Sequence, residues 1–178
     1  LNSREIAFDD LKVQTEWPHL KFIPGDGQTP FLANINFAQK IKLIKLIKTI
    51  QADYVILDLG AGTSFNVLDF FGIATQGLIV TTSERIALMN MLAFLKNFLL
   101  RVIDRSLVRK KDARDLFRSF FNQPMSPEQK TIKSLLNQIV AKDPEVGESI
   151  QNICQKYHPG IIYNMLYNPN AIKVHNNI

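Results

Sequence analysis

Asp53-Tyr-Val-Ile-Leu-Asp-Leu-Gly-Ala-Gly-Thr63 is the stretch that decides the fold expected for this chain. Tyr54 to Leu57 form an apolar, partly β-branched run, which is typical of a strand covered on both faces of a parallel sheet. We therefore expect a strand over residues 54–59. In an open α/β sheet, ligands bind outside the carboxyl ends of the strands. The carboxylate of Asp58 is placed to hold a hydrated Mg²⁺ there, or alternatively to cap the following turn.

A glycine-alanine-glycine turn at residues 60–62 follows this predicted strand directly. Glycine lets a loop approach a phosphate closely, or change shape when the phosphate leaves. A tight strand-to-helix turn without any ligand is the alternative. Thr63 and Ser64 come next, and their hydroxyls can donate to a phosphate or cap the next helix.

Strand-like and helix-like segments alternate along the chain, which favours an α/β fold with a partial parallel sheet and flanking crossover helices. We expect Asn36, Asn66 and Ser83 to begin the three helices of this part. The expected strands cover residues 20–24, 54–59, 77–82 and 160–166, and the expected helices cover 36–50, 66–71 and 83–103.

The section from 105 to 157 has a different character, because it contains no convincing strand. Ser126-Pro127 and Asp143-Pro144 each place a capping residue before a proline at the first helical position. We expect a helical insertion, 105–157, within a single α/β domain that spans 1–178. Its helices are predicted near residues 111–121, 127–141 and 144–157, and a turn is predicted at 168–170.

Composition is ordinary for a soluble globular protein, with 46% hydrophobic and 21% charged residues among 178. No uninterrupted apolar run approaches the roughly 18 residues of a membrane span, and no secretory signal is seen. Cys154 is the only cysteine, which excludes an intrachain disulfide and fits a reducing cytoplasm. The net charge of +5 indicates either phosphate-rich partners or simply solvated helix faces.

The segment from Asp53 to Phe71, continued by Gly77-Leu-Ile-Val-Thr-Thr82, resembles the second half of a MinD/ParA-type ATPase. The resemblance is strongest to the MinD-like proteins that set flagellar number, often called FlhG or FleN. Pro24-Gly-Asp-Gly-Gln28 and Ile161-Ile-Tyr-Asn164 also resemble segments of that family, so the resemblance covers most of the chain.

This resemblance implies a fold like that of P-loop NTPases, with ATP and Mg²⁺ as cofactors. It implies that Asp58 binds the metal and that Gly60, Ala61 and Gly62 form the switch II turn, which senses the nucleotide state. It also implies that Asn164 recognises adenine, a task suited to an amide that both donates and accepts hydrogen bonds. A turn asparagine with satisfied hydrogen bonds is the alternative.

Family members couple ATP-dependent homodimerisation to the placement of cellular structures such as flagella or the division site. The resemblance therefore implies a cytoplasmic protein with peripheral contact at the inner membrane. The membrane-binding members use a C-terminal helix that lies beyond the matched segments.

Two departures from the family pattern limit this expectation. The phosphate-binding loop Lys-Gly-Gly-x-x-x-Lys-[Ser/Thr] is absent, because none of the eight glycines is followed by lysine. Ser83-Glu84-Arg85 lacks the prolines that the family has there, so no catalytic role is assigned to these residues. We expect a fragment or truncated form that is not a competent ATPase by itself and holds no catalytic residue.

A non-enzymatic interaction module is the alternative function, with an anionic membrane or nucleic acid held by basic residues near the insertion. Phe117, Phe120 and Phe121 lie at helical spacing there and are expected in the core. The basic residues concerned are Arg101, Arg105, Arg109, Lys110, Lys111, Arg114 and Arg118.

The helix predicted over Lys40–Lys48 is basic and amphipathic, so it can lie on a membrane surface or cover a sheet with its lysines facing solvent. The three histidines and the single cysteine are scattered along the chain, which favours neither a zinc site nor a Cys–His catalytic pair.

Overall fold

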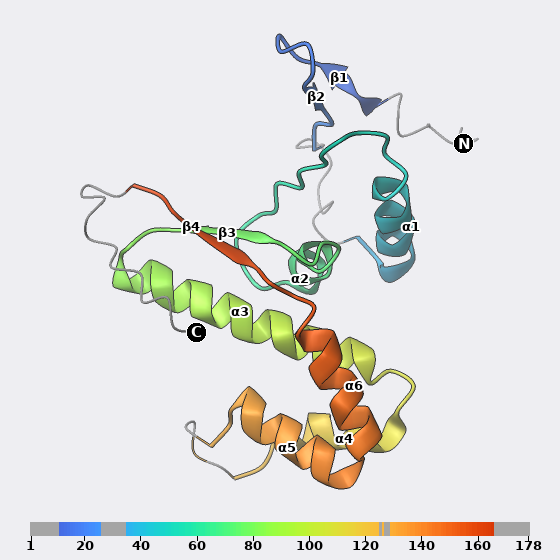
Figure 1. The fold of residues 1–178 in the computed structure, drawn as a ribbon, viewed down its shortest axis with the longest axis vertical. Helices are drawn as coiled ribbons and strands as arrows, with labels where there is room; N and C mark the ends of the chain where they lie inside the picture. The colour runs from blue at the N-terminus through green and yellow to red at the C-terminus, as the bar shows by residue number, and fades with distance from the viewer. Residues whose placement is uncertain (1–10, 26–34, 125, 127–128, 166–178) are drawn as a thin grey trace. The chain divides into compact units, whose positions relative to one another are not determined.

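The computed structural model describes residues 11–25, 35–124, 126 and 129–165 (Figure 1). The chain divides into two compact units, Leu1–Leu59 and Gly60–Ile178, and each is described by itself. The family-like residues 26–28 and the turn predicted at 168–170 lie outside the described residues.

A two-stranded hairpin opens the described part of the first unit. Strand β1 (Val13–Gln14) pairs antiparallel with β2 (Lys21–Phe22). The Thr15 hydroxyl donates to the Leu20 carbonyl at 2.8 Å and ties the intervening loop together. The strand predicted at 20–24 is therefore confirmed in a shorter form.

Helix α1 (Phe37–Ile47) begins where the sequence predicts, because Asn36 and Gln39 form a capping box. The Asn36 side chain accepts from the Gln39 N–H at 2.9 Å, and the Gln39 side chain accepts from the Asn36 N–H at 3.1 Å. Lys40 is buried, so the expectation that every lysine of this helix faces solvent is wrong at that position. Its Nζ lies 6.0 Å from the centroid of the Phe37 ring.

The strand predicted at 54–59 is not formed, and this is the main correction to the sequence-based fold. The segment has no regular secondary structure, and the Tyr54 and Ile56 side chains are each 89% exposed. A strand exists only when a neighbour takes up its backbone hydrogen bonds. No described residue pairs with this segment, so its apolar pattern alone does not produce a strand.

A small parallel sheet anchors the second unit. Strand β3 (Leu78–Thr81) pairs with β4 (Gly160–Tyr163), and the two arrows run side by side in Figure 1. Both strands were predicted and are confirmed, each with shorter bounds. The second unit thus combines helices with a parallel strand pair, as expected of the α/β class at its coarsest level.

Helix α2 (Phe65–Phe71) follows the glycine turn. Its cap is Ser64, whose Oγ accepts from the Val67 N–H at 3.4 Å, so the prediction of Asn66 as cap was wrong. An N-cap side chain must accept from a backbone N–H two or three residues further on, and Ser64 lies at that spacing from Val67.

Helix α3 (Arg85–Ser106) is the longest element, and it begins two residues later than the predicted start at Ser83. It is long and apolar enough to cross a membrane by length and composition alone, a criterion that core helices of soluble proteins also meet. Phe98, Val102 and Ile103 of this helix are buried against other helices of the second unit.

The three helices predicted between residues 105 and 157 are confirmed. They are α4 (Lys111–Phe120), α5 (Ile132–Lys142) and α6 (Pro144–Cys154). Asp143 caps α6 as predicted, accepting from the Val146 N–H at 3.0 Å. The cap of α5 is Thr131 and not Ser126, because the Thr131 side chain accepts from the Ser134 N–H at 3.1 Å.

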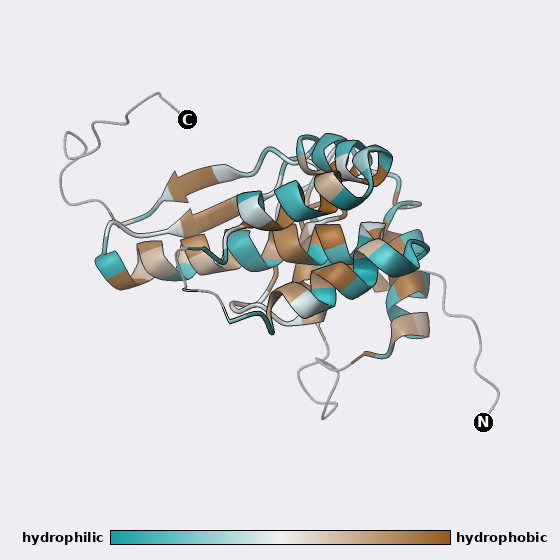
Figure 2. Ribbon diagram, turned by 90° about the horizontal axis from the view of Figure 1, so that it is seen from below, coloured by the Kyte–Doolittle hydropathy of each residue, from teal (hydrophilic) through white to brown (hydrophobic). Residues whose placement is uncertain are grey.

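Two apolar clusters form the core of the second unit, and in Figure 2 the arrows of β3 and β4 are mostly brown while the helices alternate between hydrophobic and hydrophilic residues. In the larger cluster, Gly147 lets α6 pack closely on α5, since a Cβ there would lie 2.8 Å from Val140 Cα. The buried residues of the larger cluster are Ile103, Leu107, Ala113, Phe120, Leu135, Ile139, Val146 and Ile150, and those of the smaller are Leu68, Phe98 and Val102.

Candidate functional site

The carboxyl ends of β3 and β4 meet at one edge of the parallel sheet. Thr81 lies opposite Tyr163, and the Asn164 N–H donates to the Thr81 carbonyl at 2.8 Å. The Thr82 hydroxyl oxygen accepts from the Glu84 N–H at 3.4 Å just beyond β3. Open α/β sheets bind ligands at this edge. It brings together the carboxyl ends of β3 and β4, two strands that the sequence predicted.

Asn164 extends from this edge at the end of β4 and is exposed. Its Oδ1 accepts from the Met165 N–H at 2.9 Å, and Met165 has a φ of 55°, so the backbone turns sharply there. The side-chain nitrogen of Asn164, Nδ2, has no hydrogen bond to another described residue and remains able to donate. Both alternatives for this residue, adenine recognition and a turn role, are compatible with these contacts.

The glycine turn is exposed at Gly60, Ala61 and Gly62. Gly62 has a φ of 109°, a conformation that side chains with a Cβ rarely adopt. A Cβ at Gly60 or Gly62 would meet no atom within 4 Å, so the backbone conformation and not crowding requires glycine at 62. No hydrogen bond between described residues of the second unit joins this turn to Asn164.

Asp58 belongs to the first unit and lies in the irregular segment that was predicted to be a strand. Its side chain is exposed. Among the described residues, no three His, Cys, Asp or Glu side chains gather in a way that could hold a metal ion. The metal-binding role of Asp58 remains a prediction.

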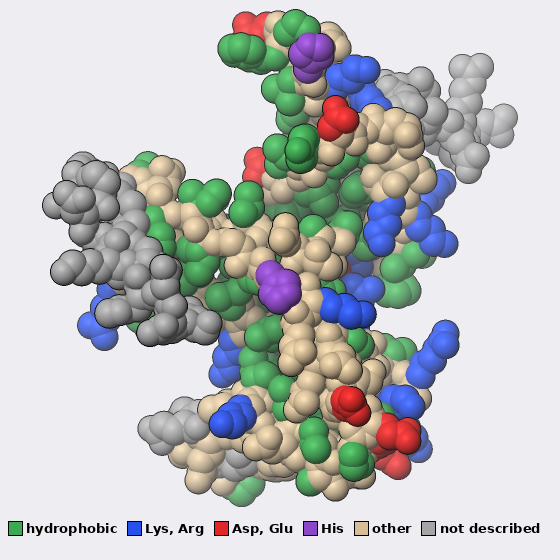
Figure 3. Space-filling model, in the orientation of Figure 1, with side chains coloured by type: hydrophobic (Ala, Val, Ile, Leu, Met, Phe, Trp, Pro, Cys, Tyr) green, Lys and Arg blue, Asp and Glu red, His purple; other side chains and the backbone are tan. Residues whose placement is uncertain are grey.

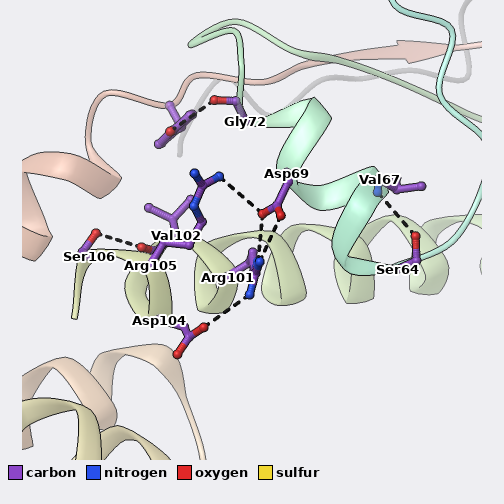
Figure 4. Close-up of polar contacts among 10 residues, drawn as sticks. Ser64, Val67, Asp69, Gly72, Arg101, Val102, Asp104, Arg105 and Ser106 are labelled. Atoms are coloured by element: carbon purple, nitrogen blue, oxygen red, sulfur yellow. Dashed lines mark hydrogen bonds and ion pairs between the residues drawn. The ribbon is translucent and has the colours of Figure 1, made fainter. Parts of the chain in front are cut away.

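A buried ion pair between α2 and α3 is a feature beside the candidate site that sequence reasoning missed (Figure 4). Asp69 of α2 has a side chain that is 2% exposed. Arg101 of α3 donates two hydrogen bonds to this carboxylate, Nε to Oδ1 at 2.8 Å and Nη2 to Oδ2 at 2.9 Å. Arg105 adds a third contact, Nη1 to Oδ1 at 3.4 Å. Removing one partner from such a pair costs about 3–5 kcal/mol because the other charge is left buried.

Arg101 is also held from other sides. Its Nη1 donates to Asp104 Oδ2 at 3.3 Å, and its guanidinium lies 4.4 Å from the centroid of the Phe65 ring. The hydrogen bonds that Arg101 donates to Asp69 raise the pKa of Arg101 above its ordinary value, and the charges of Asp69 and Asp104 add to this effect against the opposing effect of burial.

The sequence held a clue to this pair. Asp69 is the only charged residue in Phe65-Asn-Val-Leu-Asp-Phe-Phe71 and stands directly after the core residue Leu68. A carboxylate on the apolar face of a short helix is rarely buried without a partner. Its partner lies 32 residues away in the sequence, however, and local patterning does not identify it.

A cavity of about 250 Å³ opens beside this ion pair between α2, α3 and α6. Its floor is apolar, and its polar lining comes from the ion pair, Ser106 and Tyr157. The Tyr157 hydroxyl donates to the Gly72 carbonyl at 3.4 Å, which attaches the C-terminal end of α2 to the segment after α6.

The seven basic residues expected to form a patch differ in their surroundings. Arg101, Arg105 and Arg114 are engaged with Asp69 and Asp104. Figure 3 shows acidic and basic side chains interspersed on the visible face near α4–α6. Four of the seven are exposed and make no ion pair with a described acidic residue: Arg109, Lys110, Lys111 and Arg118.

Comparison of the chain with protein-family models, with curated proteins and with solved structures found no match in any of the three.

Proposed function

We propose that this chain carries the metal-binding, switch II and adenine-recognition segments of an ATPase site of the MinD/ParA type, and that it has the P-loop NTPase fold. The observation that carries the proposal is the parallel β3–β4 edge, where Thr82 and Asn164 follow the ends of two strands. The Asp58-Leu-Gly-Ala-Gly62 sequence supports it independently. In the proposed fold, residues 54–59 become a strand when a neighbouring strand is present to pair with them.

Each residue has a distinct role in the proposed site. Asp58 supplies a carboxylate to Mg²⁺, which neutralises charge on the phosphates during transfer to water. The turn of Gly60, Ala61 and Gly62 changes shape with the nucleotide state. Asn164 supplies an amide to adenine. ATP-dependent homodimerisation would then act in the placement of flagella or the division site, in the cytoplasm with peripheral contact at the inner membrane.

The phosphate-binding loop is the component that the proposed site needs from elsewhere. Such a loop surrounds the phosphates with backbone N–H groups and adds a lysine. No glycine in these 178 residues precedes a lysine, so this sequence alone does not supply it. We therefore assign ATP hydrolysis to a protein that combines these residues with such a loop.

Asn164→Ala in such a protein tests the proposal. Loss of one hydrogen-bonding amide should weaken ATP binding on the order of tenfold and reduce the preference for ATP over GTP. Calorimetric titration with both nucleotides measures this. Asn152→Ala, at an exposed position of α6, is the matched control and should bind both nucleotides like the parent. Equal affinities of parent and Asn164→Ala for both nucleotides would contradict the proposal.

A further inference from the structure

We propose that Asp69, Arg101 and Arg105 form a latch that fixes α2 on α3 and so sets the position of the glycine turn that leads into α2. In this scheme Asp69 and Arg101 are positioning residues that do not touch a ligand. The use of the latch in nucleotide sensing rests on the proposed function, whereas its existence does not.

The first step concerns α2 itself. This helix has only seven residues, and isolated helices of that length are not stable in water. Contacts to its neighbours must therefore hold it in place. Its N-terminal end follows the exposed Gly60–Gly62 turn after only two residues, Thr63 and the cap Ser64, so the position of α2 fixes the point at which the turn ends.

The second step is that α2 is held by both apolar and ionic contacts. Near its C-terminal end, the Phe71 ring packs edge-on against Phe94 and Phe98, each at 5.0 Å between ring centroids, and Leu68 lies in the same apolar cluster. The ionic contact is the pair of Asp69 with Arg101 and Arg105. Aromatic packing tolerates a small rotation, but a bidentate ion pair is lost when the helix turns away.

The third step is that Arg101 is held in place from its own helix. It binds Asp69 on α2 through Nε and Nη2, and at the same time it binds Asp104, one turn away on α3, through Nη1. Because different nitrogens make these bonds, the two carboxylates do not compete for Arg101. Asp104 instead fixes the guanidinium in the orientation that the bidentate pair with Asp69 requires.

Amide exchange measured by NMR on the 178-residue chain without nucleotide tests the latch. The reporters are the Leu68 and Gly72 N–H groups, which bond to the Ser64 and Leu68 carbonyls. In Asp69→Asn their exchange should become faster, on the order of tenfold, because the latch is lost. In Asp104→Asn it should also become faster, by a smaller factor, because Arg101 keeps both bonds to Asp69 and loses the charge that fixes its Nη1.

A core substitution separates a latch from a general loss of stability. Ile139→Val, in the buried core on α5, is the control that lowers global stability without touching α2 or its partners. It should leave the exchange of both reporters at the parent rate. Exchange in Asp69→Asn and Asp104→Asn at the parent rate, or equally fast in all three variants, would overturn the proposal. If Asp69→Asn does not fold, the comparison of Asp104→Asn with Ile139→Val decides alone.

Spin labels test the effect on the turn. Ala61→Cys and Asn97→Cys, in a Cys154→Ser background, place one label on the turn and one on the exposed side of α3. We expect a single narrow distance distribution in the parent and a broader one with Asp69→Asn. An unchanged distribution would overturn the coupling of latch and turn. Because no nucleotide is used, this outcome is separate from the ATP titrations that test the proposed function.

Discussion

At the scale of single residues, conformation and charge constrain different positions of the candidate site. Gly62 is constrained by its backbone, since its φ of 109° is strained for any residue with a Cβ. Asp58 makes no hydrogen bond or ion pair with another described residue, and its side chain is exposed in an irregular segment of the first unit. Replacing such an exposed side chain should leave the free energy of unfolding unchanged, so a change in activity would report on its function directly.

Gly62→Ala should lower the free energy of unfolding by about 1 kcal/mol, because alanine is forced into a left-handed conformation. Gly60→Ala is the matched control, since its backbone has no positive φ and its surroundings are equally open. Denaturant unfolding of both variants measures the difference. Equal stabilities would show that the turn relaxes around either substitution.

Asp58→Asn should reduce turnover at least on the order of tenfold in a protein that combines these residues with a phosphate-binding loop, because a carboxylate facing Mg²⁺ loses its charge. The melting temperature should not change, since the side chain is exposed. Asp53→Asn, also exposed, is the control and should retain activity. Unchanged turnover of Asp58→Asn at saturating Mg-ATP would reduce Asp58 to a turn residue.

At the scale of elements, predictions held where the determinant is local. Asn36 caps α1 and Asp143 caps α6, because a cap is read from residues two or three positions apart. The strand expected at 54–59 failed because a strand depends on a neighbour that local patterning does not provide. The Asp69–Arg101 pair was missed for the same reason, since it joins two helices across 32 residues.

The basic residues between α3 and α4, Arg109 to Lys111, give a prediction at the scale of elements. Replacing Arg109, Lys110 and Lys111 together with alanine should leave binding to anionic vesicles and to DNA unchanged. Arg109 lies just past the C-terminal end of α3, where the helix dipole favours a cation, and Lys110 and Lys111 are exposed at the start of α4, so all three can be solvated surface charges without a partner. Co-sedimentation and gel shifts at two salt concentrations measure this. Salt-sensitive binding by the parent that the triple variant loses would favour the interaction-module alternative.

At the scale of the whole molecule, the candidate site is divided along the chain. The boundary between the two units falls between Leu59 and Gly60, so Asp58 belongs to one unit and the glycine turn and Asn164 belong to the other. In the proposed function, the groups that hold the phosphates come from a phosphate-binding loop that this sequence does not supply.

The 178-residue chain alone should therefore bind Mg-ATP only weakly, and calorimetric titration measures this. The adenine-facing amide of Asn164 supplies one hydrogen-bonding group, whereas the backbone cradle and lysine that hold the phosphates are absent from the sequence. The net charge of +5 can attract ATP nonspecifically, so the titration is repeated at high salt, where such attraction fades. Micromolar affinity that persists at high salt would mean that other groups of this chain hold the phosphates. The proposal that a separate phosphate-binding loop supplies those groups would then be wrong.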